Sequence, residues 1–214
     1  MGVTQMKLYD ADFAPSPRRV RIFLAEKGLE VPTVKVDLRN REQLDEGFRQ
    51  VNPWCTVPAL ELDDGTSLCD IPSICLYLEQ LNPEPPLMGT DAKDRARVLM
   101  WDRHMEQDGM VAVAEAFRNS HPAFKDRALI GPHDVAQIPE LAERGRQRYG
   151  WFLDGLDQRL AASAFIAGDG YTIADITALA TIDFARAVKV GDIDGRVNVQ
   201  RWYDQVSSRP SAKA

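Results

Sequence analysis

The chain has 214 residues, of which 44% are hydrophobic and 27% are charged, and its formal net charge is -6. This length can bury the core of one large domain or of two small ones. The negative balance disfavours nucleic acid as a partner, because phosphate binding needs clustered cations. Lys7, Asp10 and Asp12 interrupt the start of the chain, so we expect no apolar signal region, and no apolar run approaches membrane-spanning length. We therefore expect a cytoplasmic protein without a nucleic-acid or membrane partner.

Three cysteines, Cys55, Cys69 and Cys75, form an odd number with no metal-type spacing. A disulfide framework or a zinc site would need paired cysteines or regularly spaced ligands. We expect reduced thiols and no metal ion.

The first 81 residues alternate between strand-like and helix-like patterns. Pro17 suits the first turn of a helix, and Gly28 suits its C-terminal cap. The pattern predicts strands at 7–9, 34–38, 59–62 and 67–68, and helices at 18–27, around Phe48 and at 72–81. The resulting order, β-α-β-α-β-β-α, predicts a small sheet with crossover helices.

Three prolines within residues 82–86 stop any helix or strand, so residues 82–91 are predicted to be a linker. Beyond it, apolar residues recur at three and four spacing in segments 95–119, 138–161, 172–188 and 199–207. Thr172 and Asp175 have the spacing of a capping box that begins the third of these segments. The predicted fold class is α/β plus all-α, with a helical second domain over residues 92–214.

The dipeptide Val57-Pro58 stands at the entry to the strand predicted at 59–62. Proline has no backbone N–H to donate, and the bond before proline has only a small preference for trans. A cis bond here would turn the amide and carbonyl of Val57 outward, toward a bound peptide. An ordinary loop is the alternative interpretation of the same dipeptide.

Taken together, these motifs resemble the cytosolic glutathione transferases of the bacterial, theta- and zeta-like kind. The resemblance covers essentially the whole chain. Its parts are Lys7-Leu8-Tyr9, Arg19-Val20-Arg21-Ile22, Ala25-Glu26-Lys27-Gly28, Asn52-Pro53 through Val57-Pro58, Asp70 before Ser73-Ile74, and Tyr171-Thr172-Ile173-Ala174-Asp175. It implies a thioredoxin-like glutathione-binding domain at 1–81, the linker at 82–91, and a helical domain at 92–214 that forms the electrophile pocket. It also implies a cytoplasmic homodimer.

The resemblance assigns glutathione contacts to particular residues of this chain. Val57 and Pro58 would hold the cysteinyl backbone, and Asp70 would receive the glutamyl ammonium unless it is only a helix cap. Ile71 stands where many members have Ser or Thr, so only its backbone amide can contribute. Gln43 and Thr56 would complete the binding set, with Gln43 in the loop that reaches the glycyl end.

The resemblance assigns activation of the glutathione thiol to Ser16. Its hydroxyl, or its backbone amide, would donate to the glutathione sulfur at the positive end of the first helix, and the alternative is a simple helix cap. Ala14 stands where the theta-like classes have their serine. Tyr9 is expected to be structural because it lies in a strand, and Cys55 is expected to be a small buried thiol rather than a partner in a mixed disulfide.

The predicted function is a glutathione S-transferase whose thiolate attacks a small hydrophobic electrophile. The segment that carries Trp101, His104, Met105, Asp108 and Met110 would line the electrophile pocket, although such an apolar face can also be core. One alternative is a transferase-like binding or regulatory protein without turnover, which Ala14 and Ile71 favour. The other is a glutathione-dependent isomerase, which is disfavoured because no Ser-Ser-Cys run follows the first strand.

Overall fold

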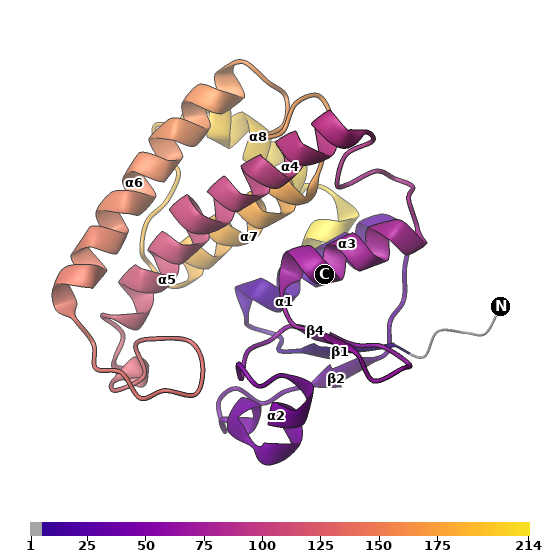
Figure 1. Cartoon of the computed structure of the whole chain (residues 1–214). Coiled ribbons are helices and arrows are strands. Elements are labelled where there is room, and N and C mark those ends of the chain that lie inside the picture. Colours follow the sequence, from indigo (N-terminus) through magenta and orange to yellow (C-terminus); the bar gives the residue numbers. More distant parts are fainter. Residues whose placement is uncertain (1–5) are drawn as a thin grey trace. The chain divides into compact units, whose positions relative to one another are not determined.

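Figure 1 shows the computed structural model, which describes residues 6–214. The chain forms two compact units. The first comprises the residues up to Pro85 together with segment 130–133 and Ala214, and the second comprises residues 86–129 and 134–213.

The first unit is built on a sheet with the strand order β2-β1-β3-β4. Its strands are β1 (Lys7–Asp10), β2 (Thr33–Lys35), β3 (Ala59–Glu61) and β4 (Ser67–Leu68). β1 runs parallel to β2 and antiparallel to β3, while β3 and β4 form a hairpin. In this register Tyr9 lies opposite Val34 on one side and Ala59 on the other.

Two of the helices of the first unit, α1 (Pro15–Lys27) and α3 (Ile71–Leu81), pack against each other. The 3-10 helix η1 (Glu42–Leu44) and the short α2 (Glu46–Val51) connect β2 to β3. Gly28 ends α1 with a φ of 62°, a left-handed conformation that glycine adopts without steric cost. The core of this unit is apolar, and its fully buried side chains include Leu8, Val20, Phe23, Leu60, Ile74 and Leu78.

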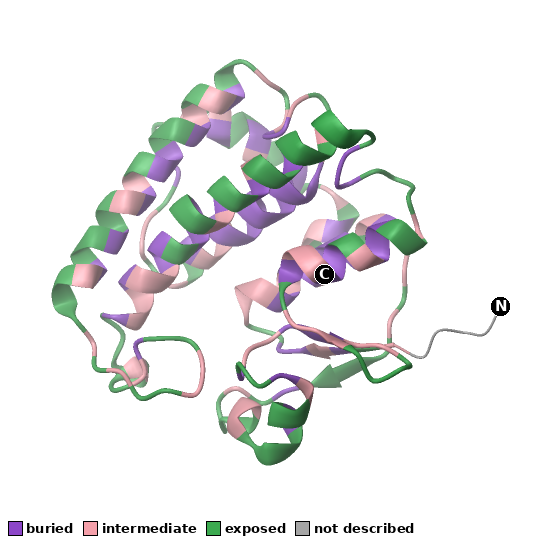
Figure 2. Ribbon diagram, viewed as in Figure 1, coloured by how far each residue is buried: buried purple, intermediate pink, exposed green. Residues whose placement is uncertain are grey.

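The second unit is helical over its described residues. Its helices are α4 (Ala92–His104), the π-helix η2 (Met105–Met110), α5 (Val111–Arg118), α6 (Pro139–Ala161), α7 (Ile173–Ala187) and α8 (Val197–Ser207), with short 3-10 helices η3 (Pro122–Phe124) and η4 (Pro210–Lys213). α4, η2 and α5 follow one another without a break in helical backbone. Figure 2 shows α7 buried along most of its length, which makes it the central helix of this unit.

The start of α7 depends on Asp175, which is fully buried. Its carboxylate accepts the backbone amide of Thr172 at 2.9 Å and that of Ile166 at 3.0 Å, and it accepts the indole N–H of Trp202 at 2.8 Å. Thr172 and Asp175 form the capping box that their spacing predicted. Burial raises the pKa of Asp175, and these hydrogen bonds oppose that effect. One carboxylate thus joins three segments of the helical core.

The fold class and the element order of the first unit confirm the sequence prediction. Two boundaries differ by three residues. The second strand was expected to run to residue 38 but ends at Lys35, because the Asp37 carboxylate accepts the amides of Arg39 and Asn40 and turns the chain. The first helix starts at Pro15, three residues earlier than expected.

Candidate functional site

Four connecting segments of the first unit meet at one edge of its sheet. β1 and β2 are parallel, so the loops that leave both strands lie at the same edge. β3 is antiparallel to β1 and to β4, so the entry to β3 and the exit from β4 lie at that edge as well. The topology therefore brings together the segments that carry Ser16, Gln43, Val57 and Asp70.

The loop before β3 is shaped by Asn52, whose side chain is buried. Its amide nitrogen donates to the Thr56 carbonyl at 2.7 Å and to the Thr56 hydroxyl at 3.0 Å, and its amide oxygen accepts the N–H of Trp54 at 3.0 Å. Asn52 is part of a motif of the family resemblance, but no role was predicted for it. The signal was present, because asparagine before proline commonly bonds the backbone of its own turn.

The Val57-Pro58 peptide bond is cis, which is the form that the ligand-holding interpretation of this dipeptide requires. Between residues 6 and 214, no hydrogen bond engages the amide or the carbonyl of Val57. Val57 is half-buried, and Pro58 beside it is buried. The backbone at this position therefore keeps both a donor and an acceptor for another peptide.

Ser16 lies in the first turn of α1, and the residue that caps the helix is Ala14. The alternative interpretation of Ser16 as the helix cap was therefore wrong, because Pro15 and Ser16 already have helical backbone. The Ser16 hydroxyl accepts a hydrogen bond from the Arg19 guanidinium at 3.4 Å, and the Arg19 side chain is buried. A hydroxyl and a cation thus lie together at the positive end of α1.

Asp70 is the residue that caps α3, and its carboxylate accepts the amide of Ser73 at 2.9 Å and the hydroxyl of Ser73 at 2.8 Å. The carboxylate is exposed and has further lone pairs, so the cap leaves room for a second donor. Ile71 buries its side chain, which leaves its backbone amide at the first position of the helix. Gln43 lies in η1, and within the described part of the chain no donor reaches its buried Oε1.

Tyr9 and Cys55 have structural surroundings. The Tyr9 hydroxyl donates to Glu61 at 2.7 Å, and its ring makes an edge contact with Phe48. Burial, followed by the hydrogen bond to Glu61, raises the pKa of Tyr9 to about 12. The Cys55 thiol is buried, as expected, and its sulfur donates to the Pro53 carbonyl at 3.7 Å.

A cluster of charges at the end of β1 was missed by the sequence analysis. The Asp10 carboxylate is fully buried and pairs with Arg21 at 2.5 Å and with Lys35 at 2.6 Å. Lys35 also pairs with Asp12, and its hydrogen bonds to Asp10 and then to Asp12 raise its pKa. These pairs anchor the loop that leads from β1 to Ser16. No local sequence pattern predicts these ion pairs, because the partners of Asp10 are Arg21 on α1 and Lys35 on β2.

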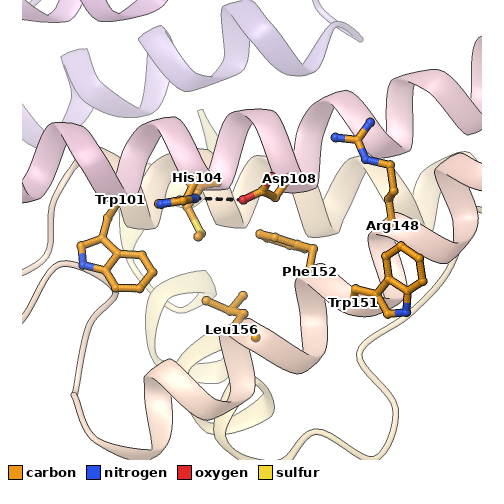
Figure 3. Close-up of a pocket in the computed structure, with 9 residues that line it drawn as sticks. Trp101, His104, Asp108, Arg148, Trp151, Phe152 and Leu156 are labelled. Carbon is orange, nitrogen blue, oxygen red and sulfur yellow. Dashed lines mark hydrogen bonds and ion pairs between the residues drawn. The ribbon is translucent and has the colours of Figure 1, made fainter.

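A cavity of about 450 Å³ lies within the second unit, and Figure 3 shows its walls. It has the size of a small-molecule site. The lining residues come from α4, η2 and α6, and they are Trp101, His104, Met105, Asp108, Arg148, Trp151, Phe152, Gly155 and Leu156. Four of the five residues that were expected to line a pocket do so. Met110 is buried and is not one of them.

Residues 6–214 contain no group of three or more histidine, cysteine or acidic residues arranged to hold a metal ion. Over the same residues, no helix combines the length and the apolar character needed to cross a bilayer.

A sheet whose loops converge beside a cis-proline strand entry, followed by a helical unit with a cavity, defines a protein with a thioredoxin-like domain and a helical domain. Two family models match the chain: "Glutathione S-transferase, N-terminal domain" over residues 13–81 and "Glutathione S-transferase, C-terminal domain" over residues 139–205. Glutathione S-transferase 2 of Saccharomyces cerevisiae is 31% identical over 212 residues, which cover 98% of this chain and 88% of that protein.

Solved structures give the same result. A glutathione S-transferase domain-containing protein from Marinobacter aquaeolei is 36% identical, with a TM-score of 0.87 and coverage of 96% of this chain and 98% of that one. Gtt2 from Saccharomyces cerevisiae is 30% identical, with a TM-score of 0.89 and coverage of 97% and 98%. The chain belongs to the glutathione S-transferase family. It is a transferase whose co-substrate is glutathione.

Proposed function

We propose that the loops at the sheet edge of the first unit bind glutathione and activate its thiol, and that the thiolate attacks a small hydrophobic electrophile held by the helical unit. The observation that carries this proposal is the unbonded backbone of Val57, which lies at the same sheet edge as the first turns of α1 and α3. The proposed domains are residues 1–81 for glutathione, 82–91 as the linker, and 92–214 for the electrophile.

Each part of glutathione has a proposed partner. The amide and carbonyl of Val57, followed by Pro58, pair with the cysteinyl backbone in the way that a free strand edge receives a peptide. The Asp70 carboxylate receives the glutamyl ammonium, and the backbone amide of Ile71 assists at the same end. Gln43 and Thr56 complete the contacts, with Gln43 at the glycyl end.

Ser16 is the proposed donor to the thiolate. A free thiol with a pKa near ~8.5 is mostly protonated at neutral pH, and lowering this pKa by about two units makes the thiolate dominant at a cost of ~2.7 kcal/mol. This free energy can come from two sources together: a hydrogen bond from Ser16 to the thiolate and the positive end of the α1 dipole. The buried Arg19 guanidinium, 3.4 Å from the Ser16 hydroxyl, adds positive charge on the same side.

The remaining parts of the proposal concern the assembly and its setting. The protein works as a homodimer in the cytoplasm, and it uses no metal ion. The family supports the dimer and the cytoplasmic location as its usual properties.

The experiment that tests the glutathione site replaces Asp70 by asparagine and measures glutathione binding by titration calorimetry. Asparagine caps a helix as well as aspartate does, so α3 and the melting temperature stay intact while the charge for the ammonium is lost. We expect glutathione affinity to fall by ~1.5 to 3 kcal/mol, the range for a hydrogen bond to a charged group. If Asp70→Asn binds glutathione as tightly as the native protein does, Asp70 is only a helix cap and does not contact glutathione.

A further inference from the structure

The three residues that precede Val57 all bond to Asn52. The side-chain oxygen of Asn52 accepts the amide of Trp54 at 3.0 Å, and its backbone carbonyl accepts the amide of Cys55 at 3.0 Å. Its side-chain nitrogen donates to the carbonyl of Thr56 at 2.7 Å and to the hydroxyl of Thr56 at 3.0 Å. Val57 follows directly and is the first residue of this stretch whose backbone stays unbonded within residues 6–214. One residue thus organises the whole turn up to the unbonded backbone.

Asn52 is itself held in place from two sides. Its amide donates to the carbonyl of Phe48 at 2.8 Å, which fixes it to the end of α2, and its side chain is completely buried. The carbonyl of Val51, one residue earlier, accepts the thiol of Cys69 at 3.7 Å. Cys69 directly precedes Asp70, so the turn is also connected to the segment that begins α3.

The turn contains a backbone conformation that needs support. Cys55 has a φ of 56°, in the left-handed region that residues with a side chain adopt rarely and at a cost in free energy. Asn52 bonds the residue before Cys55 and the residue after it. Because Val57 is two residues beyond Cys55, the direction of its amide and carbonyl depends on this supported turn.

We propose that Asn52 is a positioning residue for glutathione, which holds the backbone of Val57 in the direction that pairs with the cysteinyl residue of the peptide. The inference rests on the proposed role of Val57 in glutathione binding and adds the residue on which that role depends. Asn52 acts through Val57, because its own side chain is fully buried and engaged by the turn. Without Asn52 the turn becomes ordered only on binding, and the entropy of that ordering opposes binding.

The test replaces Asn52 by alanine and measures two ligands by calorimetry on the full chain. The ligands are glutathione and S-methylglutathione, which has the same peptide backbone but no free thiol. Both should bind Asn52→Ala about tenfold more weakly, the effect of ordering roughly one backbone residue on binding. An equal loss for both ligands places the effect at the peptide backbone. A loss confined to glutathione, or native affinity for both ligands, would overturn the inference.

Asn119 is the matched control, because it is a buried asparagine with the same kind of contacts in the second unit. Its side-chain nitrogen donates to the carbonyl of Glu115 at 2.9 Å, and its side-chain oxygen accepts the amide of Ile138 at 3.0 Å. Asn119→Ala should lower the melting temperature about as much as Asn52→Ala does, with both affinities unchanged. If Asn119→Ala weakens binding equally, the loss of stability alone explains the effect and the inference is wrong.

A milder variant decides the matter if Asn52→Ala does not fold. Asn52→Ser keeps an oxygen that can accept the amide of Trp54, but it has no donor that reaches Thr56. We expect it to bind both ligands about three- to tenfold more weakly, and native affinity in folded Asn52→Ser would contradict the inference.

The native protein distinguishes this inference from the function on which it rests. A native protein that does not bind glutathione would overturn both. A native protein that binds glutathione, together with Asn52 variants of native affinity, would leave the glutathione site in place and remove only the positioning role of Asn52.

Discussion

Lys27 is a buried lysine at the end of α1. Its ammonium lies 2.5 Å from the Glu79 carboxylate of α3 and donates to the carbonyls of Asn82 at 2.8 Å and of Pro85 at 2.5 Å. Both charged side chains are almost fully shielded from water, so screening is weak and the loss of one partner is costly. The pair joins α1, α3 and the start of the predicted linker. The motif Ala25-Glu26-Lys27-Gly28 does not reveal this pairing, because the partners of Lys27 lie more than 50 residues away.

A variant of Lys27 measures this contribution. Lys27→Met leaves the Glu79 carboxylate buried without its lysine, and we expect the free energy of unfolding to fall by ~3 to 5 kcal/mol in urea titrations. The double variant Lys27→Met with Glu79→Leu should recover part of the loss, because it also removes the buried carboxylate that has lost its lysine. Equal losses in the single and double variants would show that the loss comes from packing and not from the charge.

Ser16 offers a second test at the level of a residue. Since Ala14 and not Ser16 caps α1, Ser16→Ala should leave the helix stable. It should raise the pKa of the bound glutathione thiol by about one unit, the size of one hydrogen bond to a charged acceptor. Ultraviolet titration of the bound thiolate measures this shift, and Ser16→Thr, which keeps a hydroxyl, is the control. A thiol pKa that is the same in all three proteins would transfer the role to backbone amides.

Tyr9 predicts a pH dependence of stability. Its pKa is raised from 10.0 to about 12 in the folded state, so the folded protein holds this proton more tightly than the unfolded chain does. The stabilisation is fully present below pH 10 and is lost as the pH rises toward 12. Tyr9→Phe lacks this contribution, so its free energy of unfolding should fall less steeply over that interval than that of the native protein. Parallel slopes for the two proteins in urea titrations across this pH range would refute the shift.

At the scale of elements, α5 and α6 approach closely because of Gly145. A Cβ at this position would lie 2.7 Å from the carbonyl oxygen of Ala112 and 2.7 Å from the amide nitrogen of Ala116, which is too close for backbone atoms. Gly150 lies on the same helix and has nothing within 4 Å of its ideal Cβ. The two glycines therefore make a matched pair.

Alanine at these two positions should have opposite effects. Gly145→Ala forces α5 and α6 apart, and we expect it to destabilise the protein by about 1 to 3 kcal/mol. Gly150→Ala should stabilise it by about 0.5 to 1 kcal/mol, because alanine favours a helix over the unfolded chain. Thermal melting compares the two variants with the native protein. A neutral or stabilising Gly145→Ala would show that the helices can separate at little cost.

Helices and strands with local signals were predictable, and those fixed by distant contacts were not. The capping box of Thr172 and Asp175 depends on residues three positions apart, so sequence alone located it. No such pattern marks the π-helix η2, in which Gly109 lies so close to Phe152 of α6 that a Cβ there would meet the ring. The residues of the proposed glutathione site come from the family resemblance and stay a prediction. The roles of Asn52 and Asp10 needed three-dimensional contacts.

At the scale of the whole molecule, the proposed homodimer predicts the mass of the particle in solution and the position of its interface. Leu99 and Met100 are neighbours on α4, with side chains 45% and 48% exposed, and paired apolar residues on an otherwise charged helix favour burial against another chain. We expect sedimentation at micromolar concentration to give a particle of twice the 24.0 kDa chain mass.

Leu99→Glu combined with Met100→Glu should convert the dimer to a monomer. Val197→Glu, at an exposed apolar residue on α8, should not. A native protein that sediments as a monomer would refute the dimer, and a double variant that stays dimeric would move the interface away from this part of α4.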